Sequence, residues 1–369
     1  MPTVQRDVAF EHYLDACRWT RPLLLTTPGW LDRGLVERLD IRLRSRVTVR
    51  TVQRPNPRLD DIFSLERTVP AFDGVFAIGG GSVIDTAKAI VALRVLGGDH
   101  ALFEAILNGH ASWPEVADWL PVVAMPTTSG SGSEVTPWGT IWTGEMAKLS
   151  VHHPALKPAA AILDPSLCLT MPADVALASG LDALSHAMEA IWNRKHSPES
   201  DHLAVQAIAL IFAHLPHALA RPTIEARRQV QLASAIAGAA MAMTQTALSH
   251  SISYGLTARY GLPHGLASSL CLGEIARFNA EVDRDRIALI AHAVQTEVDG
   301  LPGMIHGWAS SLGMREHLKR YLPSDPDALD ATGLIHPARA SNNLRQADEA
   351  DAATILRRSL SAYAMPARL

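Results

Sequence analysis

The first 163 residues alternate between short apolar runs and segments with helical periodicity, and this alternation constrains the fold more than any other feature of the chain. Strands that alternate with helices usually form a parallel sheet covered by helices. The predicted strands span residues 21–29, 46–53, 74–80 and 119–128, and apolar residues at helical spacing predict a helix over 82–96. We therefore expect an α/β domain with a parallel sheet over residues 1–163.

The sequence changes character after residue 163, where strand-like runs nearly disappear and alanine-rich segments with helical periodicity follow one another. The predicted helices span residues 172–193, 199–220, 224–245, 247–260, 264–278, 284–297 and 302–321, and one more lies within 341–364. The turn-rich stretch 321–343 is expected to be a loop. We predict an all-α second domain over residues 164–369.

The composition excludes several classes of protein. With 48% hydrophobic and 19% charged residues, the 369-residue chain is typical of a soluble globular protein. A net charge of −4 without basic runs argues against nucleic-acid or anionic-membrane partners. Three separated cysteines without a CxxC pair favour a reducing compartment. The N-terminus has no apolar signal region, and we interpret residues 204–220 as a buried helix, so a cytoplasmic location is expected.

The segment IGGGSVIDTAKAI, residues 78–90, follows a predicted strand and opens a predicted helix. Gly79, Gly80 and Gly81 let the backbone approach a bound group, and the first amides of the helix can hold a phosphate. The spacing matches neither the Rossmann fingerprint nor a P-loop. A tight turn without a ligand therefore stays open at this point.

A second turn of small residues, 126–140, follows the next predicted strand. Thr127, Thr128, Ser129, Ser131 and Ser133 offer hydroxyl groups there. Open α/β sheets bind ligands outside the carboxyl ends of their strands. Two such turns at adjacent strand ends favour a phosphate-containing cofactor over two simple turns.

Four side chains of the second half have the types and spacing of a metal site. Asp182 and His186 are four residues apart in a predicted helix, so they lie on one face, one turn apart. His250 and His264 follow later in the chain. A lone His186 would more often be a packing residue, but a carboxylate with three imidazoles suits Fe(II) or Zn(II).

Four segments, in this order, resemble the iron-containing alcohol dehydrogenase family: GGGSVIDTAK, PTTSGSGSEVT, GLDALSHAMEA and SHSISYGLTARYGLPHG. The resemblance implies an N-terminal dinucleotide-binding domain over residues 1–163 and a helical domain over 164–369 that binds the metal and carries out catalysis. This is the architecture that the family shares with dehydroquinate synthase. The implied metal ligands are Asp182, His186, His250 and His264.

The resemblance also implies the cofactor contacts. Gly80, Gly81 and Ser82 would hold the pyrophosphate, and Asn56 would lie near a ribose. The further expected contacts are Thr27, Gly79, Asp85, Thr127, Thr128, Ser131 and Lys148. Most lysines are solvated at the surface, so Lys148 has that alternative as well.

Two positions depart from the family pattern. Many members have an acidic residue just after the first strand, where this chain has Thr27. A carboxylate there would repel a 2′-phosphate, so we predict that NADPH is tolerated or preferred. Many members also have a histidine where this chain has Tyr254. With a pKa of about 10, a tyrosine can donate a proton but is no ready base at neutral pH. A catalytic role and a pocket-shaping role for Tyr254 both stay open.

These features predict reversible hydride transfer between NAD(P)H and a small aldehyde, with Fe(II) or alternatively Zn(II) polarising the carbonyl. The segment around Tyr254 resembles members that reduce phosphonoacetaldehyde to 2-hydroxyethylphosphonate. Such an anionic substrate needs cations, for which Arg194, Lys195 and Arg259 are candidates. Another aldehyde or semialdehyde reductase and a dehydroquinate-synthase-like lyase are the alternatives. The family also implies a homodimer.

Overall fold

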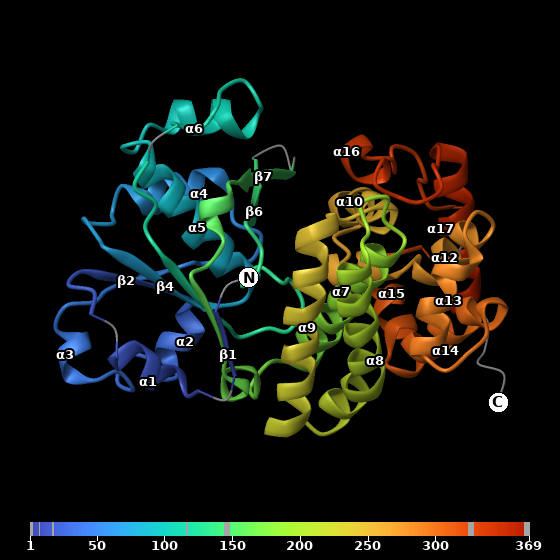
Figure 1. Ribbon diagram of the computed structural model, residues 1–369, viewed down its shortest axis with the longest axis horizontal. Helices are drawn as coiled ribbons and strands as arrows, with labels where there is room; N and C mark the ends of the chain where they lie inside the picture. Colours follow the sequence, from blue (N-terminus) through green and yellow to red (C-terminus); the bar gives the residue numbers. More distant parts are fainter. Residues whose placement is uncertain are drawn as a thin grey trace. The chain divides into compact units, whose positions relative to one another are not determined.

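The structure is a computed structural model that describes residues 3–6, 8–16, 18–115, 117–143, 148–323 and 328–364. The chain divides into two compact units, Met1–Thr170 and Met171–Leu369. Each unit has hydrophobic clusters of its own. Figure 1 shows strands and helices together in the first unit and helices alone in the second.

In the first unit the described residues form a sheet of six parallel strands, which confirms the predicted α/β fold. The strand order is β1-β8-β5-β4-β2-β3. The strands are β1 (Thr3–Arg6), β2 (Pro22–Thr26), β3 (Thr48–Thr51), β4 (Gly74–Gly79), β5 (Val122–Pro126) and β8 (Ala160–Leu163). The four predicted strands correspond to β2, β3, β4 and β5, with their ends trimmed.

Helices cover both faces of this sheet. Successive strand residues point to opposite faces, so Leu23 and Leu25 belong to one hydrophobic cluster and Leu24 to another. The helices are α1 (Phe10–Asp15), α2 (Pro28–Asp32), α3 (Ile41–Arg44), α4 (Leu59–Glu66), α5 (Gly81–Val95) and α6 (His100–Leu107), with short 3-10 turns η1 (Pro154–Leu156) and η2 (Pro165–Cys168). The predicted helix 82–96 is confirmed as α5, which begins directly after β4.

Four strands of this unit were not predicted. β1 and β8 have four residues each, and the composition of β8, Ala-Ala-Ile-Leu, has weak strand preference. The other two, β6 (Trp138–Trp142) and β7 (Lys148–His152), form an antiparallel hairpin outside the main sheet. The sequence analysis assigned residues 126–140 entirely to a turn, and this is wrong for the start of β6.

The described residues of the second unit form helices without a named strand, as predicted. The helices are α7 (Ala173–Ile191), α8 (Pro198–Ala220), α9 (Ile224–Thr244), α10 (Leu248–Tyr260), α11 (His264–Ser269), α12 (Leu272–Ala280), α13 (Arg284–Ala293), η3 (Val298–Gly300), α14 (Leu301–Ser311), α15 (Met314–Tyr321), α16 (Pro337–Ala340) and α17 (Glu349–Ala364).

Three predicted segments of this unit are wrong in part. The predicted helix 264–278 is two helices, α11 and α12, and the predicted helix 302–321 is likewise divided into α14 and α15. Gly313 separates α14 from α15 with a φ of +96°, a conformation that favours glycine and ends a helix. The predicted loop 321–343 contains α16, which starts at Pro337 as a proline at the first helical position allows. Residues 324–327 of that loop lie outside the described residues.

Within the described part of the chain, α8 is the one helix whose length and mean hydropathy of 1.7 match a membrane span. Helices α9 and α10 reach that criterion only as a pair, and they are bent by 107° at their junction. Ala204, Ile208, Ile211 and Leu215 of α8 are buried in the hydrophobic cluster of the second unit. One such helix is weak evidence for a membrane span.

Candidate active site

Helix α7 places three ionisable side chains on one buried face. Asp182, His186 and Glu189 follow one another at a spacing of four and three residues, which keeps them on the same side of a helix. All three are buried, and Glu189 is fully buried. Buried ionisable groups require partners, because the desolvation of an unpaired charge costs roughly several kcal/mol.

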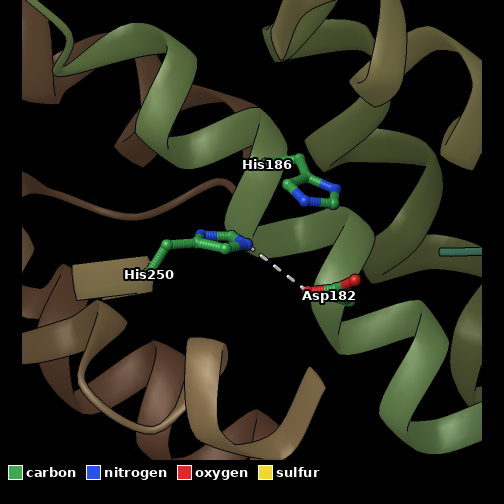
Figure 2. A group of neighbouring side chains, drawn as sticks. All are labelled: Asp182, His186 and His250. Atoms are coloured by element: carbon green, nitrogen blue, oxygen red, sulfur yellow. Dashed lines mark ion pairs between the residues drawn. The ribbon is translucent and has the colours of Figure 1, made fainter. Parts of the chain in front are cut away.

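The partners come from two helices later in the sequence, α10 and α11. The ligand atoms of Asp182, His186 and His250 all lie within 4.8 Å of one another, and Figure 2 shows their side chains pointing toward a common centre. The Nε2 atom of His250 lies 3.6 Å from Asp182 Oδ1, and that of half-buried His264 lies 3.9 Å from the same oxygen. The structure thus brings together all four side chains predicted to bind the metal.

Gly265 allows this approach of the helices. A Cβ atom at this position would lie 1.8 Å from the carbonyl oxygen of Ala178 and 3.1 Å from the Cβ atom of Asp182. Any other residue would therefore push the start of α11 away from α7. The glycine next to His264 fixes how near that imidazole comes to Asp182.

Glu189 holds His250 from the side away from the centre. His250 Nδ1 lies 2.6 Å from Glu189 Oε2, and the His250 backbone N–H donates to Glu189 Oε1 at 3.1 Å. A carboxylate only accepts, so Nδ1 carries a proton, and Nε2 is the nitrogen that can offer a lone pair to a metal ion. That buried Nε2 has no hydrogen-bond partner among the described residues and faces Asp182. A metal-bound histidine has this carboxylate–histidine arrangement.

Ser268 supports the aspartate in a comparable way. Its Oγ donates to Asp182 Oδ1 at 2.9 Å, and it lies 3.2 Å from the Oγ of Ser185. All three side chains are buried. The sequence analysis did not single out Glu189 or Ser268. Glu189 is the last acidic residue of the segment GLDALSHAMEA, so its place in that motif was the available signal.

The electrostatics of this group favour a bound cation. Burial alone would raise the pKa of Asp182, but His186, His264 and the nearby His250 side chain hold that pKa well below its usual value. Burial alone would lower the pKa of His250, but Glu189 and Asp182 outweigh it and raise the pKa to about 9. One carboxylate and three imidazoles with an outer carboxylate therefore fit a divalent transition metal ion. Metal binding by these residues stays a prediction, which this geometry supports.

Tyr254 lies one turn after His250 on α10 and is half-buried. Its ring centroid is 6.4 Å from that of His264 and 5.3 Å from that of His336. Its hydroxyl accepts a hydrogen bond from Arg339 Nε at 3.3 Å. The structure thus places Tyr254 beside the predicted metal-binding group, without deciding between a catalytic and a pocket-shaping role.

In the first unit, the two predicted cofactor turns pack against each other. A Cβ atom on Gly80 would lie 3.1 Å from Thr128 Oγ1, and one on Gly81 would lie 2.7 Å from the side chain of Ser131. The Thr127 N–H donates to the carbonyl of Gly79 at 3.0 Å. The turns therefore meet at the carboxyl ends of β4 and β5, which are neighbours in the sheet. At Gly79 itself, a Cβ atom would lie 2.3 Å from Val83, so glycine is needed for the tight turn.

Two more predicted cofactor residues lie at this edge of the sheet. The Asn56 N–H donates to Ser82 Oγ at 3.1 Å, and Asn56 has a φ of +58° that favours glycine or asparagine. Thr27 follows β2, the strand next to β4, and its carbonyl accepts from the Trp30 N–H. Lys148 is further along, in β7, where its Nζ lies 5.9 Å from the ring of Trp142.

Asp85 has protein partners for both of its carboxylate oxygens. It accepts from Ser133 Oγ at 2.6 Å and from the Thr140 N–H at 2.9 Å. The fully buried Lys88, which the sequence analysis did not single out, donates to Ser133 O, Ser133 Oγ and Trp138 O at 2.5–2.8 Å. Together these bonds tie the hairpin to α5. A cofactor contact by Asp85 stays a prediction.

Residues 6–165 match the iron-containing alcohol dehydrogenase family, and residues 176–360 match the C-terminal part of the Fe-containing alcohol dehydrogenase family. The chain belongs to the iron-containing alcohol dehydrogenase family. Among curated members of the family, phosphonoacetaldehyde reductase from Streptomyces viridochromogenes is 37% identical over 69% of this chain and 66% of its own length. A 4-hydroxybutyrate dehydrogenase from Cupriavidus necator is 29% identical over 92% of each chain.

Solved structures of iron-containing alcohol dehydrogenases also match. Sulfoacetaldehyde reductase from Bifidobacterium kashiwanohense, determined in complex with NAD⁺, has a TM-score of 0.87 and 29% identity over 98% of this chain and 97% of its own. The matched region spans less than two thirds of the first curated relatives, 66% of one and 56% of the next. Membership in this family of oxidoreductases confirms the resemblance stated from the sequence motifs.

Proposed function

We propose that this iron-containing alcohol dehydrogenase interconverts a small aldehyde and its primary alcohol with NAD(P)H. One observation carries the proposal: Asp182, His186, His250 and His264 converge from three helices, and Glu189 holds the Nδ1 proton of His250. That arrangement leaves imidazole lone pairs and a carboxylate facing one centre. It is suited to holding a Lewis acid against a carbonyl oxygen.

The proposed substrate is a short aldehyde with an anionic group, and phosphonoacetaldehyde, reduced to 2-hydroxyethylphosphonate, is the first candidate. Three similar proteins support this class, since their names specify phosphonoacetaldehyde, sulfoacetaldehyde and 4-hydroxybutyrate. All three compounds carry an acidic group close to the reacting carbon. Sulfoacetaldehyde and 4-oxobutanoate are therefore the next candidates.

A divalent ion, Fe(II) or alternatively Zn(II), bound by Asp182, His186, His250 and His264 would supply Lewis acidity, and the nicotinamide would supply hydride. Glu189 keeps the proton on His250 Nδ1, and Ser268 orients Asp182 through Oδ1. The side chains of Asp182, His186 and His250 are buried. The Tyr254 hydroxyl is the group proposed to hold a proton beside the developing alkoxide.

For the cofactor we propose that NADPH is used as well as or better than NADH, because Thr27 has no carboxylate to repel a 2′-phosphate. Gly80, Gly81 and Ser82 are proposed to hold the pyrophosphate. The packing of both glycines against Thr128 and Ser131 at the carboxyl ends of β4 and β5 supports this, because open α/β sheets bind ligands at that edge.

We also propose a cytoplasmic homodimer. The two described cysteines, Cys168 and Cys271, are buried and form no disulfide with each other, as expected in a reducing compartment. Light scattering on the eluted protein tests the dimer. A monomer at micromolar concentration would contradict it.

The deciding experiment measures loss of NAD(P)H absorbance with phosphonoacetaldehyde, sulfoacetaldehyde, 4-oxobutanoate and propanal. The protein is prepared without metal and then loaded anaerobically with Fe(II) or Zn(II). We expect aldehyde reduction by the loaded protein and none by the metal-free protein. Full activity without metal would refute the proposal.

Asp182→Ala provides the matched variant. It removes the carboxylate that lies at the centre of the three imidazoles, so metal content and activity should both be lost. Asp285→Ala, at an exposed aspartate of α13, serves as the control and should keep both. Elemental analysis of both variants reports metal content independently of turnover.

A further inference from the structure

The segment before and within α16 is fixed onto α10 beside the predicted metal-binding group. The His336 N–H donates to Ser251 Oγ at 2.6 Å, and that hydroxyl donates to the carbonyl of Leu334 at 3.0 Å. Ser251 is buried and directly follows His250 in α10. The Leu334 and Ile335 N–H groups both donate to Glu349 at 3.0 Å. Residues 334–336 are therefore held both by Ser251 of α10 and by Glu349 of α17.

This anchoring brings a cation to the far side of Tyr254. Arg339, in α16, donates from Nε to the Tyr254 hydroxyl at 3.3 Å, and the His336 ring lies edge-on to the Tyr254 ring at 5.3 Å. On its other side, Tyr254 neighbours His264 at 6.4 Å between ring centroids. Tyr254 thus lies between the predicted metal-binding group and a pair of basic side chains.

The guanidinium of Arg339 is available to a ligand. The residue is half-buried, and within the described part of the chain no carboxylate forms an ion pair with it. Its Nε is bound to Tyr254, which leaves the two terminal nitrogens for another partner. A guanidinium presents its N–H groups in a planar fork that matches two oxygens of a carboxylate, phosphonate or sulfonate.

The cations suggested from the sequence are placed differently. Arg259 donates to the carbonyls of Asp330 and Thr332, and Lys195 donates to Gln245 Oε1. Arg194 is exposed. The contacts of the described residues therefore favour Arg339 as the cation nearest to Tyr254.

We propose that Arg339, with His336, binds the anionic end of the substrate while the aldehyde end lies at His264 and the other predicted metal ligands. This inference rests on the proposed function, and it assigns the residues that select for an acidic aldehyde. The ligand chemistry is a compact oxyanion joined by a short chain to the carbonyl. Tyr254 orients Arg339 and separates the two ends of the site.

The first test compares phosphonoacetaldehyde with 3,3-dimethylbutanal, in which a neutral tert-butyl group replaces the phosphonate at similar size. Arg339→Met should lower the ratio of the two kcat/KM values, anionic over neutral, by about 30-fold or more, because a charge-assisted bidentate contact is lost. Arg339→Lys keeps the charge without the fork and should give an intermediate ratio. Sulfoacetaldehyde and 4-oxobutanoate in the same assay show which oxyanion is preferred.

Arg320→Met is the matched control, since Arg320 is an exposed arginine of the same unit with a single 3.5 Å contact to Asp174. It should leave the ratio within twofold of the wild type. An equal loss for both aldehydes in Arg339→Met, or no change in the ratio, would overturn the proposal. Thermal melting of each variant identifies any loss of folding. If Arg339→Met does not fold, the ratio measured for Arg339→Lys decides whether the proposal holds.

A binding measurement separates this inference from the proposed function. Calorimetric titration of the metal-loaded protein with ethylphosphonate, ethanesulfonate and propionate needs no turnover. We expect binding by the wild type and at least tenfold weaker binding by Arg339→Met. Absence of any anion binding by the wild type would reject the inference even if aldehydes are reduced. Anion binding without aldehyde reduction would instead reject the proposed function.

Discussion

The Nδ1 atom of His250 lies 2.6 Å from a carboxylate oxygen of Glu189, and the backbone N–H of the same histidine donates to the other oxygen. One buried carboxylate thus fixes both the position and the tautomer of this imidazole. The consequence is that Nε2, the nitrogen left to bind a metal ion, faces Asp182. Outer contacts of this kind usually change metal affinity without touching the metal.

Glu189→Gln tests this relationship. The amide can donate to Nδ1 and so favour the tautomer with the proton on Nε2, where the metal would bind. We expect metal affinity to fall by about 10- to 100-fold. Competition with a chelator for Zn(II) or Co(II) measures it, with exposed Glu199→Gln as control. An affinity equal to that of the wild type would show that the carboxylate only fills space.

Thr27→Asp tests the cofactor preference. Thr27 follows β2 and is the N-cap residue of α2, but its side chain makes no capping hydrogen bond, so the substitution changes charge more than structure. A new carboxylate should accept bonds from an unphosphorylated ribose and repel a 2′-phosphate. The ratio of kcat/KM with NADPH to that with NADH should fall by about tenfold or more, which corresponds to roughly 1.4 kcal/mol. Thr354→Asp, at an exposed threonine, is the control. A wild type that prefers NADH would contradict the proposal that NADPH is used as well as or better than NADH.

Lys88→Met tests the buried lysine of α5. Its ammonium donates to two backbone carbonyls and to Ser133 Oγ, and it neighbours the carboxylate of Asp85. Removing one partner of a buried charged group costs about 3–5 kcal/mol, because the other stays buried and uncompensated. We expect a loss of this size in the free energy of unfolding by denaturant. Exposed Lys319→Met should lose little, and a loss of under about 1 kcal/mol in Lys88→Met would count against the network.

His306→Phe tests the pH dependence of stability. Burial, with a smaller effect of Arg277, lowers the pKa of His306 from 6.5 to about 4. Because the folded pKa lies below the unfolded one, the contribution of neutral His306 is complete above pH 6.5 and is lost as the pH falls toward 4. The full loss corresponds to about 3 kcal/mol.

Unfolding by denaturant at pH 7.5 and pH 4.5 measures this effect. The wild type should lose more stability between the two pH values than His306→Phe does, whereas exposed His202→Phe should behave as the wild type. Identical losses in the wild type and His306→Phe would place the acid sensitivity elsewhere.

The parts of the fold that the sequence predicts are those with local patterns. β2, β4 and β5 are apolar runs, β3 alternates and is β-branched, and Asp182 with His186 has the spacing of one helical turn. All of these patterns are visible without tertiary information. β8, with two alanines, and the hairpin β6–β7 depend on neighbours that the local pattern does not contain. They were missed for that reason.

The outer parts of the site require the tertiary structure. Glu189 contacts His250, which lies 61 residues later in the chain, and Tyr254 contacts Arg339, which lies 85 residues later. Arg339 also lies in a stretch predicted to be a loop, where no periodicity marks an inward-facing side chain. Sequence motifs therefore indicated the reaction class, while the residues proposed to select the substrate emerged from the packing of α16 on α10.

Gly265 has a consequence for any effort to diversify this enzyme. A single methyl group there would overlap a backbone carbonyl, which cannot rotate away as a side chain can. Each variant of Gly265 in a mutational library should therefore either fold and bind metal or fail to do both. We expect no variants with intermediate stability. Attempts to enlarge the pocket are better directed at Tyr254, where a side chain faces its neighbours and the helix backbone can stay in place.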